Sequence, residues 1–302
     1  NVGEWLEAFG AIEADPGKVF GEWDDAVQEV SSVVDAMLPE SELDRILADT
    51  KESIAKQSGK LRHTGLAFAA LEELRSGSKL APQLDFGTPG EKQTEWVQLL
   101  NTGAFDDTPP RSYQVDPAWL PLMKKAPDSW KRNYHLGIYY FRQQDWERVR
   151  QFAERALAQN RNAWTLHLAG MAYWKDEDKM QGLQLLAEAA RCPEADAYLV
   201  KDVLKLLILE QEYQTVLDLY PALAPIHQTR PMAKLQYAYA LARTGKLAEA
   251  ENVLLGNDGL YLPDVREGAV DITNLYIWLQ EQKGIPAEKI QVPTVLDFRM
   301  KG

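Results

Sequence analysis

Four histidines, one cysteine and 45 acidic residues are the side chains with which this 302-residue chain could hold a metal or catalyse a reaction. The histidines are His63, His135, His167 and His227. None has a second histidine three or four residues away, the spacing that puts two ligands on one helical face. A metal site would need ligands from separate helices, and we predict none.

The acidic residues and the cysteine also give no pattern typical of catalysis. Acidic pairs such as Asp106/Asp107 are adjacent, so on a helix they point apart, whereas acid/base catalysis needs converging carboxylates. Cys192 precedes Pro193, and a single cysteine cannot form an intrachain disulfide. The sequence contains no phosphate-binding loop, dinucleotide-binding, G-x-S-x-G or H-E-x-x-H motif. We predict no catalytic residue, no cofactor and no enzymatic activity.

The charge of the chain disfavours nucleic acid and anionic membranes as partners. Its formal net charge is -12, whereas phosphate binding needs clustered Lys and Arg. Residues 1 to 60 contain 14 acidic and 5 basic side chains, so they carry a net charge of -9. The densest apolar run, VLKLLIL, is much shorter than the roughly 18 residues of a membrane span and is interrupted by Lys205.

The elements that would position any functional residues form an internal repeat. The stretch LARTGKLAEAENVLL, residues 241 to 255, has the pattern of two helices joined by a tight turn at Gly245. Equivalent turns precede Trp146 and Tyr213. One small or apolar position in the second helix of each pair recurs at spacings of 33, 34 and 34, as Val149, Gly182, Val216 and Ala250. A position in the first helix recurs at the same spacings, as Gly137, Gly170, Leu204 and Ala238.

These units resemble the tetratricopeptide repeat (TPR) family. The Leu-Gly-x-x-Tyr step of that family is matched by Leu136, Gly137 and Tyr140, and its alanine near the end of the second helix by Ala156 and Ala189. The resemblance covers about residues 130 to 255. It implies an all-α, right-handed superhelical array in which small residues let the two helices of one hairpin approach closely.

The flanks of the array are predicted to be helical as well. We expect an irregular helical region over residues 1 to 127 that packs on the array, four TPR-like units over 128 to 255, and a capping helix with a tail over 256 to 302. Within these flanks the patterns predict helices at about 3 to 14, 22 to 37, 40 to 57, 60 to 75, after Asp116, and from Asp271 to Gln282. Pro263 should prevent the helix before it from resuming.

Four short motifs give a second, narrower resemblance. The segments LDFGTPG, SYQVDPAWL, GNDGLYLPDVREG and LDFRM are similar to the C-terminal helical half of large bacterial proteins. Those proteins place a β-rich domain of unknown function, thought to have carbohydrate-related roles, ahead of TPR units. Because the chain also begins at Asn1 without methionine, we expect a piece of a longer bacterial protein, located in the cytoplasm.

In TPR arrays one face of each first helix lines a concave groove. The resemblance therefore places the candidate partner-binding residues on these helices: Tyr134, Phe141, Trp164, His167, Met171, Trp174, Lys175, Tyr198 and Tyr239. Some TPR proteins clamp a peptide carboxylate with Lys and Asn, but those positions here are Tyr134 and Ile138. We expect Trp164, His167, Met171 and Trp174 to share one helical face.

Two interpretations of these aromatic residues remain open. They are either buried against a flanking segment, such as residues 103 to 127 or a missing N-terminal domain, or they anchor a protein or peptide partner. The loop of residues 104 to 116 is one candidate ligand, and the N-terminal domain of the full-length chain is another. We predict a non-catalytic TPR interaction or scaffold module. The alternative is an accessory helical region of a carbohydrate-active enzyme whose catalytic domain is missing from this chain.

Overall fold

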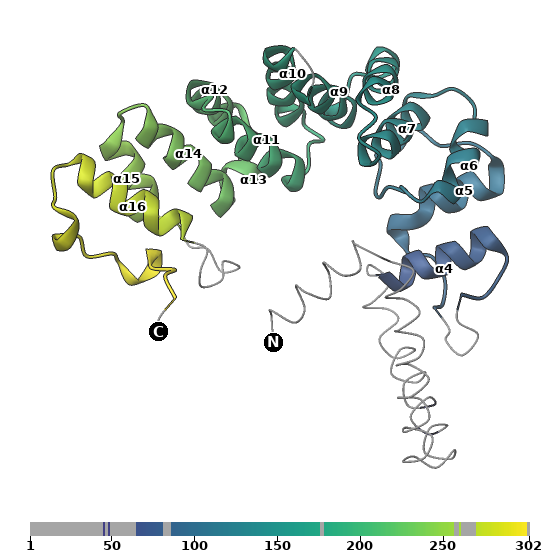
Figure 1. The fold of residues 1–302 in the computed structure, drawn as a ribbon, viewed down its shortest axis with the longest axis horizontal. Helices are drawn as coiled ribbons and strands as arrows, with labels where there is room; N and C mark the ends of the chain where they lie inside the picture. The colour runs from purple at the N-terminus through teal and green to yellow at the C-terminus, as the bar shows by residue number, and fades with distance from the viewer. Residues whose placement is uncertain are drawn as a thin grey trace, which may run out of the picture. The chain divides into compact units, whose positions relative to one another are not determined.

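The computed structural model describes Arg45, Ala48 and residues 65 to 80, 86 to 175, 178 to 256, 260 and 270 to 300. Within these ranges the regular structure is entirely helical (Figure 1). The prediction of an all-α fold is therefore confirmed for the described part of the chain. Apart from Arg45 and Ala48, which are helical, the helices predicted over residues 3 to 57 lie outside the described residues, as does Pro263.

The chain divides into two compact units, residues 1 to 97 and residues 98 to 302. We predicted that the array begins at residue 128, and the division falls before that residue. The described part of the first unit contains helix α4, Gly65–Ser76, and the short helix η1, Glu91–Gln93. Helix α4 confirms the helical pattern of that segment and buries Ala67, Ala70 and Leu71. Helix α5, Thr94–Thr102, follows η1 and crosses the division.

The second unit consists mainly of consecutive helical hairpins. Four hairpins are formed by α7/α8, Trp130–Arg142 and Trp146–Gln159; α9/α10, Ala163–Lys175 and Lys179–Arg191; α11/α12, Ala197–Leu209 and Tyr213–Leu219; and α14/α15, Pro231–Arg243 and Leu247–Leu255. Shorter helices precede, separate and follow them: η2 Pro117–Trp119, α6 Leu120–Lys125, η3 Tyr220–Ala222, α13 Pro225–Gln228, η4 Ala287–Lys289 and η5 Thr294–Leu296. Helix α16, Asp271–Gln282, has the bounds predicted from the sequence.

The turn inside three of the hairpins has the same backbone geometry. Gln144, Gln211 and Gly245 have positive φ angles of 58°, 62° and 84°, and they lie 67 and 34 residues apart. In each turn the residue that follows the positive-φ residue donates its backbone N–H to a carbonyl oxygen of the first helix, at 2.9 to 3.1 Å. The acceptor lies five residues before the donor. This is the bond that ends a helix with a left-handed residue. The predicted turns before Trp146, Tyr213 and Leu247 are thereby confirmed.

The repeated small positions lie where the helices touch. A Cβ atom at Gly182 would lie 2.4 Å from the backbone nitrogen of Trp174 and 2.8 Å from the carbonyl oxygen of Gly170. Helices α9 and α10 therefore cross backbone against backbone. The equivalent side chains Val149, Val216 and Ala250 are fully buried. The positions that repeat in the sequence are therefore positions at which helices pack against each other.

Gly137 differs from this expectation in one respect. We predicted that it would separate the two helices of its own hairpin. A Cβ atom at Gly137 would instead meet Leu168 Cδ2 at 2.6 Å, and Leu168 belongs to α9, the first helix of the next hairpin. The fully buried leucine fills the space that the missing side chain leaves. Gly137 thus allows close packing between two successive hairpins.

Successive hairpins pack against each other along the chain. The first helices α7 and α9 are in contact, as are α11 and α14, and each second helix also packs on the first helix that follows it. Helix α16 continues this order, because it packs on both α14 and α15. Gln280 on α16 donates to Glu251 at 2.7 Å, and Lys283 forms an ion pair with the same carboxylate. Helix α16 therefore caps the last hairpin, as predicted.

Both ends of the second unit are fixed by side-chain hydrogen bonds. Asp116 accepts a hydrogen bond from the backbone N–H of Ala118 at 2.8 Å and so caps the helix that was predicted to follow it. At the other end, the Thr273 hydroxyl donates to the carbonyl of Leu296 at 2.6 Å. Leu296 is fully buried, so the irregular tail is anchored on α16.

The crossing at Gly182 can be tested by adding one methyl group. In an open helix Gly→Ala gains about 1 kcal/mol of helix propensity. At Gly182 the new Cβ meets backbone atoms that cannot rotate away, so we expect Gly182→Ala to destabilise the protein by about 1–3 kcal/mol. Urea unfolding measures the change. Gln184→Ala, at an exposed site on the same helix, is the control and should change stability by less than about 0.5 kcal/mol. A stabilised Gly182→Ala variant would contradict the close crossing.

The shared turn geometry gives a second test, in which glycine is introduced at one turn and removed from an equivalent turn. A non-glycine residue with positive φ costs roughly 1–2 kcal/mol. Gln211→Gly should therefore stabilise the protein by up to about 1 kcal/mol, whereas Gly245→Ala should destabilise it by a similar amount. Thermal unfolding of both variants checks the signs. Changes of the same sign would show that the two turns are not equivalent.

Candidate functional site

A groove in the second unit lies along the first helices. It has a volume of about 660 Å³ and is bounded by α11, α14 and α16. We call it the C-terminal groove, and its lining includes Lys201, Lys205, Leu209, Met232, Tyr239, Arg243 and Trp278. Its volume is within the range of roughly 300–1,000 Å³ that is usual for ligand sites.

Arg243 organises one end of the C-terminal groove. Its guanidinium lies 5.3 Å from the centre of the Tyr239 ring and 5.0 Å from that of Trp278. It also donates a hydrogen bond to the Tyr239 hydroxyl at 3.1 Å. The cation is thus held between two aromatic side chains, and Tyr239 orients its planar fork.

The α11 side of the C-terminal groove is positively charged. Lys201 and Lys205 are exposed, lie four residues apart on α11, and form no ion pair with a carboxylate in the described part of the chain. Asp271, on α16, is the acidic residue in the groove lining. The groove therefore has cations on α11 and α14 and a carboxylate on α16.

A smaller groove adjoins the first and lies along α9 and α11. It has a volume of about 250 Å³ and is lined on the α9 side by His167, Met171 and Trp174. We call it the central groove. Lys205 and Leu209 line both grooves, so the two adjoin at these side chains. Leu209 is 69% exposed, which is unusual for a leucine within a helical array.

Two side chains of the central groove are held by neighbouring helices. Trp174 donates its indole N–H to Glu210 at 2.9 Å, and Glu210 also forms an ion pair with Lys179. Burial lowers the pKa of His167, an effect partly opposed by Asp202 and Asp196. His167 is therefore neutral near pH 7 and contributes a flat, weakly polar surface.

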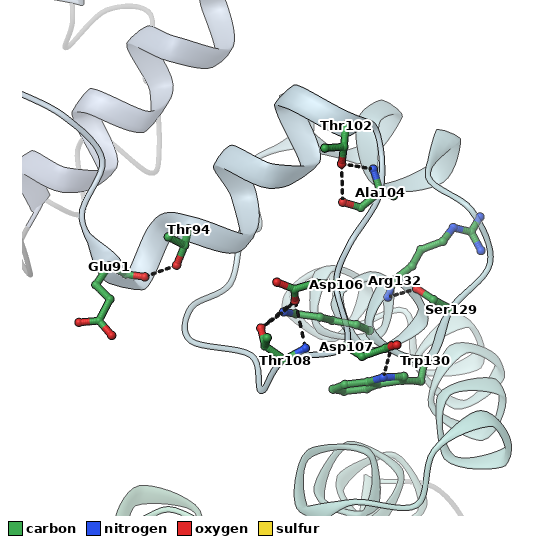
Figure 2. A network of polar contacts seen from close by, with 11 residues as sticks. Glu91, Thr94, Thr102, Ala104, Asp106, Asp107, Thr108, Ser129, Trp130 and Arg132 are labelled. Carbon is green, nitrogen blue, oxygen red and sulfur yellow. Dashed lines mark hydrogen bonds and ion pairs between the residues drawn. The ribbon is translucent and has the colours of Figure 1, made fainter.

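The corresponding face of α7 is covered by the chain itself. The side chain of Lys131 is fully buried, and its ammonium donates to Asp106 at 2.7 Å. The Phe105 ring stacks on His135 with 4.9 Å between ring centres. Figure 2 shows Asp106 beside Thr108, and Asp107 accepting from the Trp130 indole at 3.1 Å. We call residues 104 to 108 the covering loop.

The structure places the remaining predicted site residues along the first helices. Tyr134, Phe141 and Trp164 are half-buried, and Phe141 packs edge-on against Trp146. Lys175 lies 4.2 Å from the centre of the Trp174 ring. Tyr198 is 77% exposed, one turn before Lys201. Of the four residues expected on one face of α9, His167, Met171 and Trp174 line the central groove and Trp164 does not.

Most residues that line the C-terminal groove were absent from our candidate site, Lys201, Lys205 and Arg243 among them. Trp278 was missed because it lies outside the repeats, on the helix that we treated only as a cap. Its spacing from Asp271, Asn274 and Leu275 puts these four residues on one helical face, and this signal could have identified it. Leu209 was missed because the hydrophobic run of α11 resembles a buried segment.

The described residues offer no arrangement typical of catalysis. Among them, no group of three or more histidine, cysteine or acidic side chains could hold a metal ion. Burial raises the pKa of the Cys192 thiol, with Glu194 and Glu188 adding to the effect, so this group is a weak nucleophile. Among the same residues, no helix has the length and apolar character needed to cross a membrane.

Comparisons with known proteins add no assignment. Protein-family models, curated proteins and solved structures all give no match to this chain. The geometry of the grooves is therefore the basis for the proposals below.

The covering loop makes a prediction about pH. Burial raises the pKa of Asp106, but hydrogen bonds from Lys131 and Thr108 and the ammonium charge outweigh it, so the pKa lies below 3.8. A lowered folded-state pKa stabilises the protein above the unfolded pKa of about 3.9, and this contribution is lost as pH falls through the folded value. We expect Asp106→Asn to destabilise the protein by about 2–3 kcal/mol at pH 7, because buried Lys131 loses its anionic partner.

Urea unfolding at pH 7 and pH 3 checks this prediction. The difference between the original protein and Asp106→Asn should shrink at pH 3, where protonation begins to remove the charge from Asp106 itself. Asp218→Asn, at an exposed position on α12, is the control and should change stability by less than about 0.5 kcal/mol at both pH values. An equal loss at pH 7 and pH 3 would show that the Asp106 charge does not hold the loop.

Proposed function

We propose that this chain is a TPR-like, right-handed superhelical interaction module that binds a segment of a partner protein along its first helices and catalyses no reaction. The observation that carries the proposal is that the central and C-terminal grooves adjoin at Lys205 and Leu209. Both are lined from equivalent positions of successive first helices, as the grooves of a scaffold would be.

The lining has the chemistry expected of a peptide site. Aromatic and aliphatic side chains supply apolar contact area, while the cations Lys201 and Lys205 on α11 and Arg243 on α14 line the C-terminal groove. Exposed Leu209 adds apolar surface that water does not favour. Protein interfaces typically combine such anchors with polar groups at their rim.

The alternative of a carbohydrate-binding accessory region is less well supported. Sugar rings stack on open aromatic faces, but Arg243 lies over both Tyr239 and Trp278 and Lys175 lies over Trp174. These cations occupy ring faces that a sugar would need. A peptide with carboxylate or aliphatic side chains requires no such open face.

The proposal can be tested with a displayed library of random peptides selected on the full chain. We expect selected peptides to lose about tenfold in affinity for Leu209→Ser, because this side chain lines both grooves. Leu209 is a better target than Trp174, since Trp174 also bonds to Glu210 and its removal would affect folding. Fluorescence anisotropy measures the affinities.

The control is Ile226→Ser, which removes a similarly exposed aliphatic side chain, 63% accessible, from α13. Ile226 is not part of either groove lining, so this variant should bind the selected peptides as the original protein does. Failure to select any peptide, or equal binding by Leu209→Ser, would refute a peptide groove. Binding of oligosaccharides with the same sensitivity to Leu209→Ser would favour the carbohydrate alternative.

A further inference from the structure

The covering loop shows which kinds of side chain can pack on a first helix of this array. Its sequence places one aromatic residue before two acids, Phe105, Asp106 and Asp107. The aromatic ring stacks on His135 and one carboxylate pairs with Lys131, both on α7. An aromatic–acidic segment therefore already lies on one first helix of the protein.

The positions that hold the covering loop recur in the C-terminal groove. By the spacings of 33, 34 and 34 residues, Lys131 and His135 on α7 correspond to Met232 and Gln236 on α14. Met232 and Gln236 both line the C-terminal groove. The same face of a first helix is thus covered by the chain at α7 and lines an open groove at α14.

The cations of the C-terminal groove do not lie at the repeat position that Lys131 occupies in α7. Lys201 and Lys205 are on the neighbouring helix α11, and both are exposed. They are four residues apart, which is about 6 Å along a helix. Alternate side chains of an extended peptide are separated by roughly 6.6 Å, so two carboxylates two residues apart match the two lysines.

We infer that the C-terminal groove binds an extended acidic peptide of a partner protein, in which an aromatic or aliphatic anchor precedes carboxylates at alternate positions. This inference rests on the proposed function and specifies its ligand. The anchor contacts Met232 on α14, while the carboxylates lie along α11 beside Lys201 and Lys205. Asp271 on the opposite wall repels carboxylates, so it fixes the side on which they lie.

A pair of synthetic peptides tests the inference on the full chain. The probe is a fluorescein-labelled peptide with the core Phe-Asp-Ser-Asp-Leu, and its matched control has Asn in place of each Asp. We expect the acidic peptide to bind about tenfold more tightly at low salt, and the advantage to shrink as ionic strength rises. Fluorescence anisotropy gives both affinities.

Charge reversal locates the binding site. Lys201→Glu/Lys205→Glu should weaken binding of the acidic peptide by about tenfold or more, because like charges replace two attractive ones. Lys246→Glu/Lys289→Glu changes the net charge by the same amount at exposed positions outside the groove. This control should bind the acidic peptide within about twofold of the original protein. All four lysines are exposed, so neither variant removes core contacts.

Each contrary outcome has a distinct meaning. Equal binding of the Asp and Asn peptides, or equal losses in the two charge-reversal variants, overturns the inference. Equally tight, Lys201- and Lys205-dependent binding of single-stranded oligodeoxythymidine would show a general polyanion site, which also overturns it. If the peptide library yields neutral or basic peptides that depend on Leu209, the proposed function stands and only the acidic specificity fails. If the library yields no binder, both fail.

Discussion

The arrangement of the second unit depends on how closely the backbones of α9 and α10 approach each other. At Gly182 the space for a side chain is already taken by the backbone of Trp174 and the carbonyl of Gly170. Any larger residue would push the helices apart and turn α9 about its axis. With this face of α9 fixed on α10, His167, Met171 and Trp174 face α11 and line the central groove. Two glycines thus determine where the candidate site lies.

The turns give three of the hairpins the same internal geometry. Each described turn at Gln144, Gln211 and Gly245 ends a first helix with a left-handed residue and starts the second helix two residues later. A constant turn gives a constant angle between the helices, so equivalent positions of successive first helices fall on a common surface. The two grooves adjoin at Lys205 and Leu209 as a result.

The sequence predicted those features that depend on local spacing. The hairpin turns, the helix of residues 271 to 282 and the buried repeated positions follow from periodicity and from glycine. It did not predict the contact of Gly137 with Leu168, the pairing of Lys131 with Asp106 or the position of Trp278 in a groove. Each of these depends on a neighbour from another helix or loop, and the repeat spacing carries no information about such neighbours.

The buried ion pair on α7 and the exposed lysines on α11 contribute differently to the stability of the fold. Fully buried Lys131 pairs with Asp106, and removing one partner of such a pair leaves an uncompensated polar group, so the covering loop is a permanent part of the fold. Lys201 and Lys205 are exposed and remain hydrated, so the fold does not need a partner for them. An exposed pair contributes little, about 0–1 kcal/mol, which makes binding there exchangeable. Specificity would then come from matching several weak charges and one apolar anchor together, since no single contact is strong enough to supply it.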